Sequence, residues 1–174
     1  PREARALAQE MVDIGNNVGR QTIAIISDMD QPLGYAIGNS LEVIEAINTL
    51  KGNGPKDLLE LTLTLGSYML ILGKRASSFE EGYKMLLENI KNGKALEKLK
   101  EFVKAQGGDE KYIDNTDCCE KASFIIEVKA EKSGIISKIH AEEVGLIAME
   151  LGAGRVTKES KIDLSVGIVL NKKR

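Results

Sequence analysis

The sequence has little of what many specialised proteins depend on. It has no tryptophan, and its 174 residues include only three prolines, three phenylalanines, one histidine and two cysteines. A single histidine excludes a histidine-rich metal site. The cysteines, Cys118 and Cys119, are adjacent, and adjacent cysteines rarely pair because the disulfide would be strained. Without a disulfide framework, we expect a cytoplasmic protein.

Strong charge and long apolar runs are also missing. The formal net charge is −2, with 29% charged residues. That balance gives no electrostatic reason to expect nucleic acid or an anionic membrane as a partner. No apolar run approaches the roughly 18–20 residues that cross a bilayer, and the first residues lack the apolar segment of a signal peptide. We therefore expect no nucleic-acid partner and no membrane association.

Apolar periodicity is what the first 106 residues do have. It predicts helices at 2–16, 37–50, 56–73, 78–91 and 93–105. The short, β-branched apolar run at 22–26 predicts a strand buried on both faces, as in a parallel sheet. One strand for about five helices is too few for a self-sufficient α/β sheet.

The pattern changes after residue 106. Residues 107–122 are polar and are interpreted as a linker, and beyond them the pattern predicts strands at 124–130, 135–139 and 162–170 and a helix at 141–151. We therefore expect a partial α/β domain at 1–106 and a truncated α+β domain at 123–174. Because both ends look cut, we expect a fragment of a larger enzyme.

The loop after the first predicted strand is the best candidate site, because ligands gather beyond the carboxyl ends of strands in open α/β sheets. Asp28 and Asp30 lie in this loop, and Glu42 and Glu45 lie on the helix that follows. Loop carbonyls with a carboxylate would suit K⁺, since hard cations take oxygen ligands. The alternative is that the aspartates cap the loop and the glutamates are solvated.

Other chemical candidates are weaker. Gly152-Ala153-Gly154-Arg155 follows a predicted helix, whereas a phosphate-binding turn should follow a strand, so a helix end is the better interpretation. His140 has no serine or cysteine nucleophile in a matching motif. The residues alone therefore indicate one possible cation or ligand site but no reaction.

Several stretches resemble the pyrimidine-nucleoside phosphorylase and thymidine phosphorylase family, and the bacterial broad-specificity branch is the closer one. The stretches are SDMDQPLGYAIGNSLEV at 27–43, KGNGPKDL at 51–58, LTLGS at 63–67, AQGGD at 105–109, LGAGR at 151–155 and IDLSVGIVLNKK at 162–173. The resemblance covers essentially the whole chain. It implies an α/β fold class, with a helix-rich part of the large α/β domain of a nucleoside phosphorylase followed by a small α+β C-terminal domain.

The resemblance implies a homodimeric enzyme with its active site in a cleft between a small helical domain and the large domain. Such an enzyme cleaves uridine, thymidine and deoxyuridine with phosphate as co-substrate, and it releases the base and a pentose 1-phosphate. The family's phosphate loop and the histidine, arginine, serine and lysine that grip the base have no counterpart in this sequence. We therefore assign no catalytic residue and expect the chain alone to be inactive.

The resemblance also implies a structural K⁺. Its ligands match the carbonyls of Leu33 and Ala36 and the carboxylate of Glu45, which is now preferred over the other three carboxylates of the loop and helix. The remaining ligands have no counterpart in the sequence, so the chain alone should bind the ion weakly or not at all. Val12 matches a position that lines the base pocket.

Two other interpretations stay open. Residues 124–140 have the strand–turn–strand pattern of lipoyl and biotinyl domains, which would make the protein a non-catalytic carrier or binding module. Lys132 precedes the Ser133-Gly134 turn but lacks the Met-Lys or Asp-Lys context of a carrier lysine. The anthranilate phosphoribosyltransferase class shares the overall fold, but it lacks matches to the stretches above.

Overall fold

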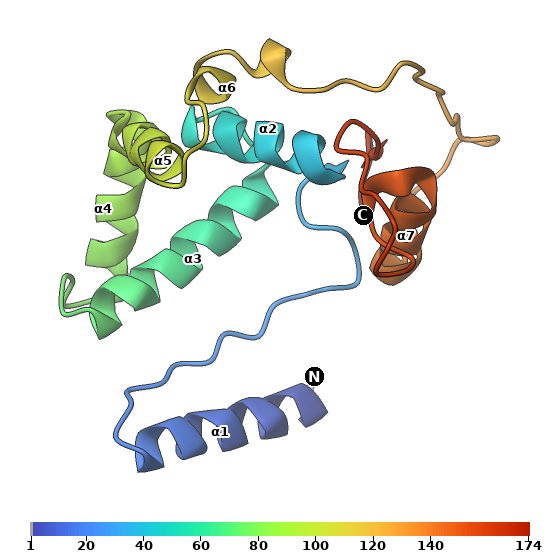
Figure 1. Ribbon diagram of the computed structural model, residues 1–174. Coiled ribbons are helices and arrows are strands. Elements are labelled where there is room, and N and C mark those ends of the chain that lie inside the picture. Colours follow the sequence, from blue (N-terminus) through green and yellow to red (C-terminus); the bar gives the residue numbers. More distant parts are fainter. Residues whose placement is uncertain (1) are drawn as a thin grey trace.

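All five helices predicted in the first 106 residues are present. A computed structural model describes residues 2–174. The helices are α1 (Arg2–Asn17), α2 (Asn39–Leu50), α3 (Lys56–Leu72), α4 (Phe79–Lys91) and α5 (Lys94–Ala105). Figure 1 shows α2–α5 gathered together, whereas α1 lies apart at the end of an extended segment.

Shorter elements follow. They are α6 (Lys111–Asp114), the 3₁₀ turn η1 (Thr116–Cys118), α7 (Ala141–Ala148) and the π-helical turn η2 (Met149–Ala153). Gly152 has a φ of 114°, which no α-helical residue adopts, so the helix ends there as predicted.

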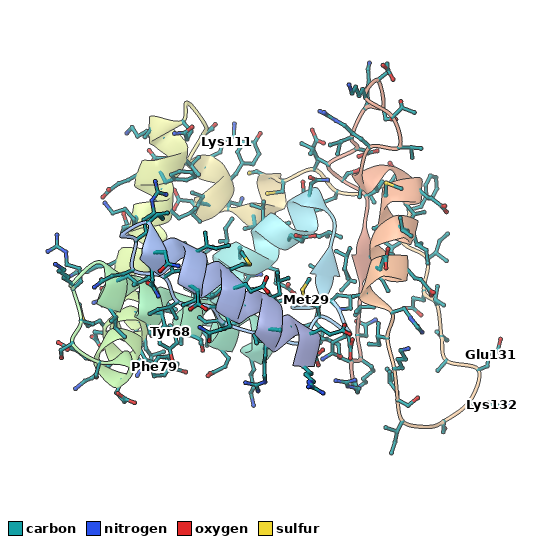
Figure 2. The ribbon with its side chains drawn as sticks, turned by 90° about the horizontal axis from the view of Figure 1, so that it is seen from below. Met29, Tyr68, Phe79, Lys111, Glu131 and Lys132 are labelled. Carbon is teal, nitrogen blue, oxygen red and sulfur yellow. The ribbon has the colours of Figure 1, made fainter. Side chains whose placement is uncertain are left out.

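The main packed pair is α3 with α4. Leu63 on α3 is only 1% exposed, and Ser67 one turn later is fully buried, with its hydroxyl donating to the Leu63 carbonyl at 2.6 Å. The rings of Tyr68 and Phe79 lie 5.3 Å apart where the two helices meet (Figure 2). Ile47 on α2 is equally buried. These residues make the core.

One small sheet joins distant parts of the chain. Strand β1 (Ala36–Ile37) pairs antiparallel with β2 (Ile168–Val169), with Ala36 opposite Val169. The strand predicted at 162–170 is therefore present only as β2. The helix-rich chain with one small sheet agrees with the expected α/β class.

The strands predicted at 22–26, 124–130 and 135–139 are wrong. No backbone–backbone hydrogen bond within residues 2–174 involves these segments. A strand forms only where a neighbour accepts and donates along its edge, and none of the described elements lies beside them in that way. The run at 22–26 is also not buried on both faces, and Phe124 and Val128 are 87% and 95% exposed.

The helices of residues 2–174 include none that is both long and apolar enough to cross a bilayer.

Candidate functional site

Two carboxylates of α2 fold back onto the loop that precedes it. Glu45 Oε1 accepts hydrogen bonds from the backbone N–H groups of Tyr35 at 2.9 Å and Ala36 at 3.2 Å. Glu42 Oε1 accepts from the Gly38 N–H at 3.1 Å. Residues three apart lie on one face of a helix, so both glutamates reach the same loop. The loop is thus held by carboxylates rather than by a longer strand.

Two glycines let the backbone of this loop pass close to other groups, one beside Glu45 and one beside the backbone of Val166. Gly34 has a φ of 68°, and a Cβ added to it would lie 2.0 Å from Glu45 Oε2. Gly38 has a φ of 140°, and an added Cβ would lie 2.5 Å from the Val166 carbonyl oxygen. Only glycine adopts such backbone angles without strain. The loop therefore wraps tightly around the Glu45 carboxylate.

A lysine from the far end of the chain binds the same loop. Lys173 Nζ donates to the carbonyl oxygens of Pro32 at 2.6 Å and Gly34 at 2.8 Å and forms an ion pair with Asp57. The ammonium also lies 5.5 Å from the centre of the Tyr35 ring, within cation–π range. The Lys173 side chain is only 9% exposed.

Asp57, in the first turn of α3, completes this cluster. Its Oδ2 also accepts the Gly34 N–H at 3.2 Å. Burial raises the pKa of Asp57, but hydrogen bonds from Lys173 and from the N–H groups of Gly34 and Leu58 outweigh it, so the pKa lies below its ordinary value. The carboxylate is therefore held in its charged form.

The contact between the two chain segments is longer than the labelled strands. The Leu170 N–H donates to the Tyr35 carbonyl at 2.8 Å, and the Arg174 N–H donates to Gln31 Oε1 at 3.2 Å. Arg174 Nη2 also pairs with Asp28 at 2.8 Å. The first two of these contacts continue the antiparallel register of β1 and β2, which places residue 32 opposite residue 173. Residues 28–37 and 168–174 thus form one ribbon.

An open hollow of about 340 Å³ lies beside the ribbon. Its lining comes from β1, α2 and the turn before α3, and it includes Tyr35, Ala36, Glu45, Asn48 and Asn53. In the part of the chain that the structure describes, the carboxylates of Glu42, Glu45 and Asp57 lie around this loop with the Lys173 ammonium, and the carboxylate of Asp28 pairs with Arg174. This balance favours a cation over an anion.

Three of the four predicted site residues lie here. Glu45 and Ala36 are in hydrogen-bond contact, and Leu33, 45% exposed, is in the same loop. Oxygen donors of this kind are chemically suited to K⁺. Val12 is half-buried on α1, which has no substantial contact with another described element, so the structure does not bring it to this loop.

The sequence left two interpretations of the carboxylates near this loop: a cation site, or aspartates that cap the loop beside solvated glutamates. The structure agrees with each interpretation in part. Asp28 caps the loop as the alternative expects, because its Oδ1 accepts the Asp30 N–H at 2.8 Å. Glu42 and Glu45 are not simply solvated, since each accepts backbone N–H groups.

The remaining candidate residues do not come together with groups that would suggest a reaction. His140 is exposed at the start of α7, and Cys118 and Cys119 are both free thiols. Lys132 lies with Glu131 on a projecting loop that no strands flank, so nothing supports the carrier hypothesis (Figure 2). Among residues 2–174, no three histidine, cysteine, aspartate or glutamate side chains cluster as metal ligands.

Two residues of the cluster were missed by sequence reasoning. Lys173 lies in a run of basic residues that looks solvated, and Asp57 looks like an ordinary first-turn acid of a helix. The two residues pair with each other across 116 residues of the chain. The one available signal was that both lie in stretches that resemble the phosphorylase family.

Two protein families match separate parts of the chain. Residues 2–96 match the a/b domain of the glycosyl transferase family, and residues 135–174 match the pyrimidine nucleoside phosphorylase C-terminal domain. The first of these matches covers more than half of the chain. The order of the two domains agrees with the expectation from the sequence.

Pyrimidine-nucleoside phosphorylases from several bacteria are similar in sequence to nearly the whole of this chain. The protein of Bacillus subtilis is 58% identical over 171 residues, and those of Staphylococcus epidermidis and Staphylococcus aureus are 60% and 59% identical over the same length. The alignments cover 98% of this chain and 40% of each relative. The chain belongs to the pyrimidine-nucleoside phosphorylase family.

Proposed function

We propose that this chain supplies part of a cytoplasmic, homodimeric pyrimidine-nucleoside phosphorylase. The substrates are uridine, thymidine and deoxyuridine, with phosphate as co-substrate. Phosphate bonds to the anomeric carbon of the sugar as the bond from that carbon to the base nitrogen breaks, giving a pentose 1-phosphate and the free base. The 58% identity to the Bacillus subtilis enzyme over 171 residues is the observation that carries this proposal.

The 174-residue chain alone has no phosphorolytic activity in this proposal. The hollow beside the Glu45 loop is lined by no histidine, arginine, serine or lysine side chain. The one histidine of the chain, His140, has no hydrogen-bonded side-chain partner within residues 2–174. Val12 contributes an apolar contact to the base within the complete enzyme.

The loop around Glu45 contributes to a structural K⁺ site. The ligands from this chain are the carbonyls of Leu33 and Ala36 and the carboxylate of Glu45. Support comes from the contact between Glu45 and Ala36, the hollow beside them and the excess of carboxylates around the loop. The ion, when bound, supplies a fixed positive charge that orders the loop. The chain alone binds it weakly or not at all.

A chimera tests the proposal. In the Bacillus subtilis enzyme, the 171 matched residues would be replaced by those of this chain, and uracil release from uridine would be measured with and without phosphate. We expect phosphate-dependent release by the chimera and none by the 174-residue chain. A chimera with the melting temperature of the parent but no activity would refute the proposed reaction. Uracil release by the chain alone would refute its inactivity.

A further inference from the structure

The Lys173 ammonium is fully coordinated by the protein. An ammonium has three N–H donors, and here each has an acceptor: the Pro32 carbonyl, the Gly34 carbonyl and the Asp57 carboxylate. Surface lysine pairs usually leave the ammonium in water and contribute little. At 9% exposure, Lys173 is instead a lysine whose charge is held inside a small oxygen cage.

This cage fixes the peptide groups on both sides of Leu33. Lys173 binds the Pro32 carbonyl, in the peptide group before Leu33, and the Gly34 carbonyl, in the peptide group between Gly34 and Tyr35, whereas the peptide group after Leu33 is held through its Gly34 N–H. Asp57 holds the Gly34 N–H as well, and the next two N–H groups, of Tyr35 and Ala36, are held by Glu45. The backbone from residue 32 to residue 36 is therefore pinned by Lys173 and Asp57 at one end and by Glu45 at the other.

Lys173 does not occupy the oxygens assigned to the ion. Its acceptors are the carbonyls of residues 32 and 34, whereas the proposed ligands are the carbonyls of Leu33 and Ala36 and the Glu45 carboxylate. A lysine that competed with K⁺ would bind those same oxygens. The arrangement is that of two neighbouring cation positions, one filled permanently by a side chain.

We propose that Lys173, together with Asp57, is a positioning residue that fixes the loop of residues 32–36 in the form that binds K⁺. Its role in ion binding rests on the cation site of the proposed function, whereas its hold on the loop does not. Residues that orient the ligands of a metal typically contribute about 10- to 100-fold to metal affinity.

Hydrogen exchange in the 174-residue chain tests the hold on the loop without any ion. Lys173→Met keeps an apolar side chain about as long as the lysine stem and removes the ammonium, and Lys172→Met is the control, because Lys172 is exposed. We expect the Tyr35 and Ala36 amides to exchange about tenfold faster in Lys173→Met and at the wild-type rate in Lys172→Met. Unchanged exchange in Lys173→Met would overturn the proposal. If that variant does not fold, Asp57→Asn carries the same expectation.

Titration of the chimera with K⁺ at constant ionic strength tests the role in ion binding. The readout is the apparent dissociation constant of K⁺, obtained from the rise in melting temperature with K⁺ concentration, because a bound ion stabilises the folded state by RT ln(1 + [K⁺]/Kd). We expect Lys173→Met to raise it about 10- to 100-fold, Lys172→Met to leave it unchanged and Lys173→Arg to restore part of the loss. An unchanged or lower value in Lys173→Met would overturn the positioning role, since a competing lysine predicts tighter binding.

The two proposals fail in different ways. A wild-type chimera whose melting temperature ignores K⁺ would overturn the cation site, and with it the role of Lys173 in ion binding. Uracil release by that chimera would still decide the phosphorolysis. A K⁺ response that is the same in all variants would overturn the role of Lys173 alone.

Discussion

Large apolar side chains make up a similar share of the α3–α4 pair and of the segment 124–136, but their exposure to solvent differs. Leu63 of α3 is 1% exposed, whereas Ile125 is 90% exposed. The helices satisfy their backbone hydrogen bonds internally and need a neighbour only for their apolar face. The segment 124–136 would need a neighbour for its backbone as well.

The comparison shows which part of the chain is held by local hydrogen bonds and packing. Local hydrogen bonds and the packing of α3 on α4 order the helical cluster without help from a sheet. In the segment 124–136 the large apolar side chains are exposed to solvent. Figure 1 shows this stretch as an arch that runs away from the helices. Apolar content alone therefore does not decide burial; a backbone partner does.

A matched pair of truncations tests this comparison most strongly. We expect Leu63→Ala to lower the free energy of unfolding by about 2–5 kcal/mol, because it leaves a cavity between α3 and α4. Ile125→Ala should change it by less than about 0.5 kcal/mol, since that side chain is already in water. Urea denaturation followed by circular dichroism measures both. Equal losses would mean that the segment 124–136 is buried in solution.

A second pair compares the loop of the candidate site with an open turn. Gly34 and Gly107 have φ values of 68° and 79°, but only Gly34 faces another group where a Cβ would go. We expect Gly107→Ala to cost about 1 kcal/mol, from backbone strain alone. Gly34→Ala should cost more, because the methyl group displaces the Glu45 carboxylate. Denaturation midpoints check the order, and a larger loss at Gly107 would contradict it.

The smallest expected effect concerns pH. The folded pKa of Asp57 is lowered, so its contribution to stability is present above the unfolded pKa, near 4, and is lost as pH falls through the folded value. Asp57→Asn should therefore reduce the loss of stability on acidification. Asp117, whose pKa Lys121 lowers in an exposed pair, is the control. We expect added salt to weaken the Asp117 contribution more than that of Asp57. Denaturation midpoints between about pH 2 and pH 6, measured at low and high salt, check both.

The helices could be predicted because their signal is local. Each amphipathic run places its apolar side chains at helical spacing, and Ser78 caps α4 by accepting the Glu81 N–H. The strands could not be predicted, because an apolar run such as 22–26 does not show whether a second strand is present to form backbone hydrogen bonds with it. The prediction at 162–170 shows how far the sequence pattern can be used. Of that run, only Ile168–Val169 form a strand, because they pair with β1.

The part of the candidate site that is local in sequence could be predicted, and the part that depends on distant residues could not. Tyr35 and Ala36 lie only ten and nine residues before Glu45, so a local loop–helix pattern brings them together. Lys173 reaches that loop across 139 to 141 residues, a distance over which the apolar and charge patterns carry no information. Only the packed backbone shows that the two meet.

The Lys173 cage also has a consequence for the order of folding. Contacts within α3 and α4 join residues close in sequence, whereas the cage closes a loop of about 140 residues. Chain segments far apart pay a closure entropy before their contacts are made, so local helices form first. We expect the helical cluster to form early and the ribbon of residues 28–37 and 168–174 to close late. The loop of the candidate site would then be the last part of the chain to become native.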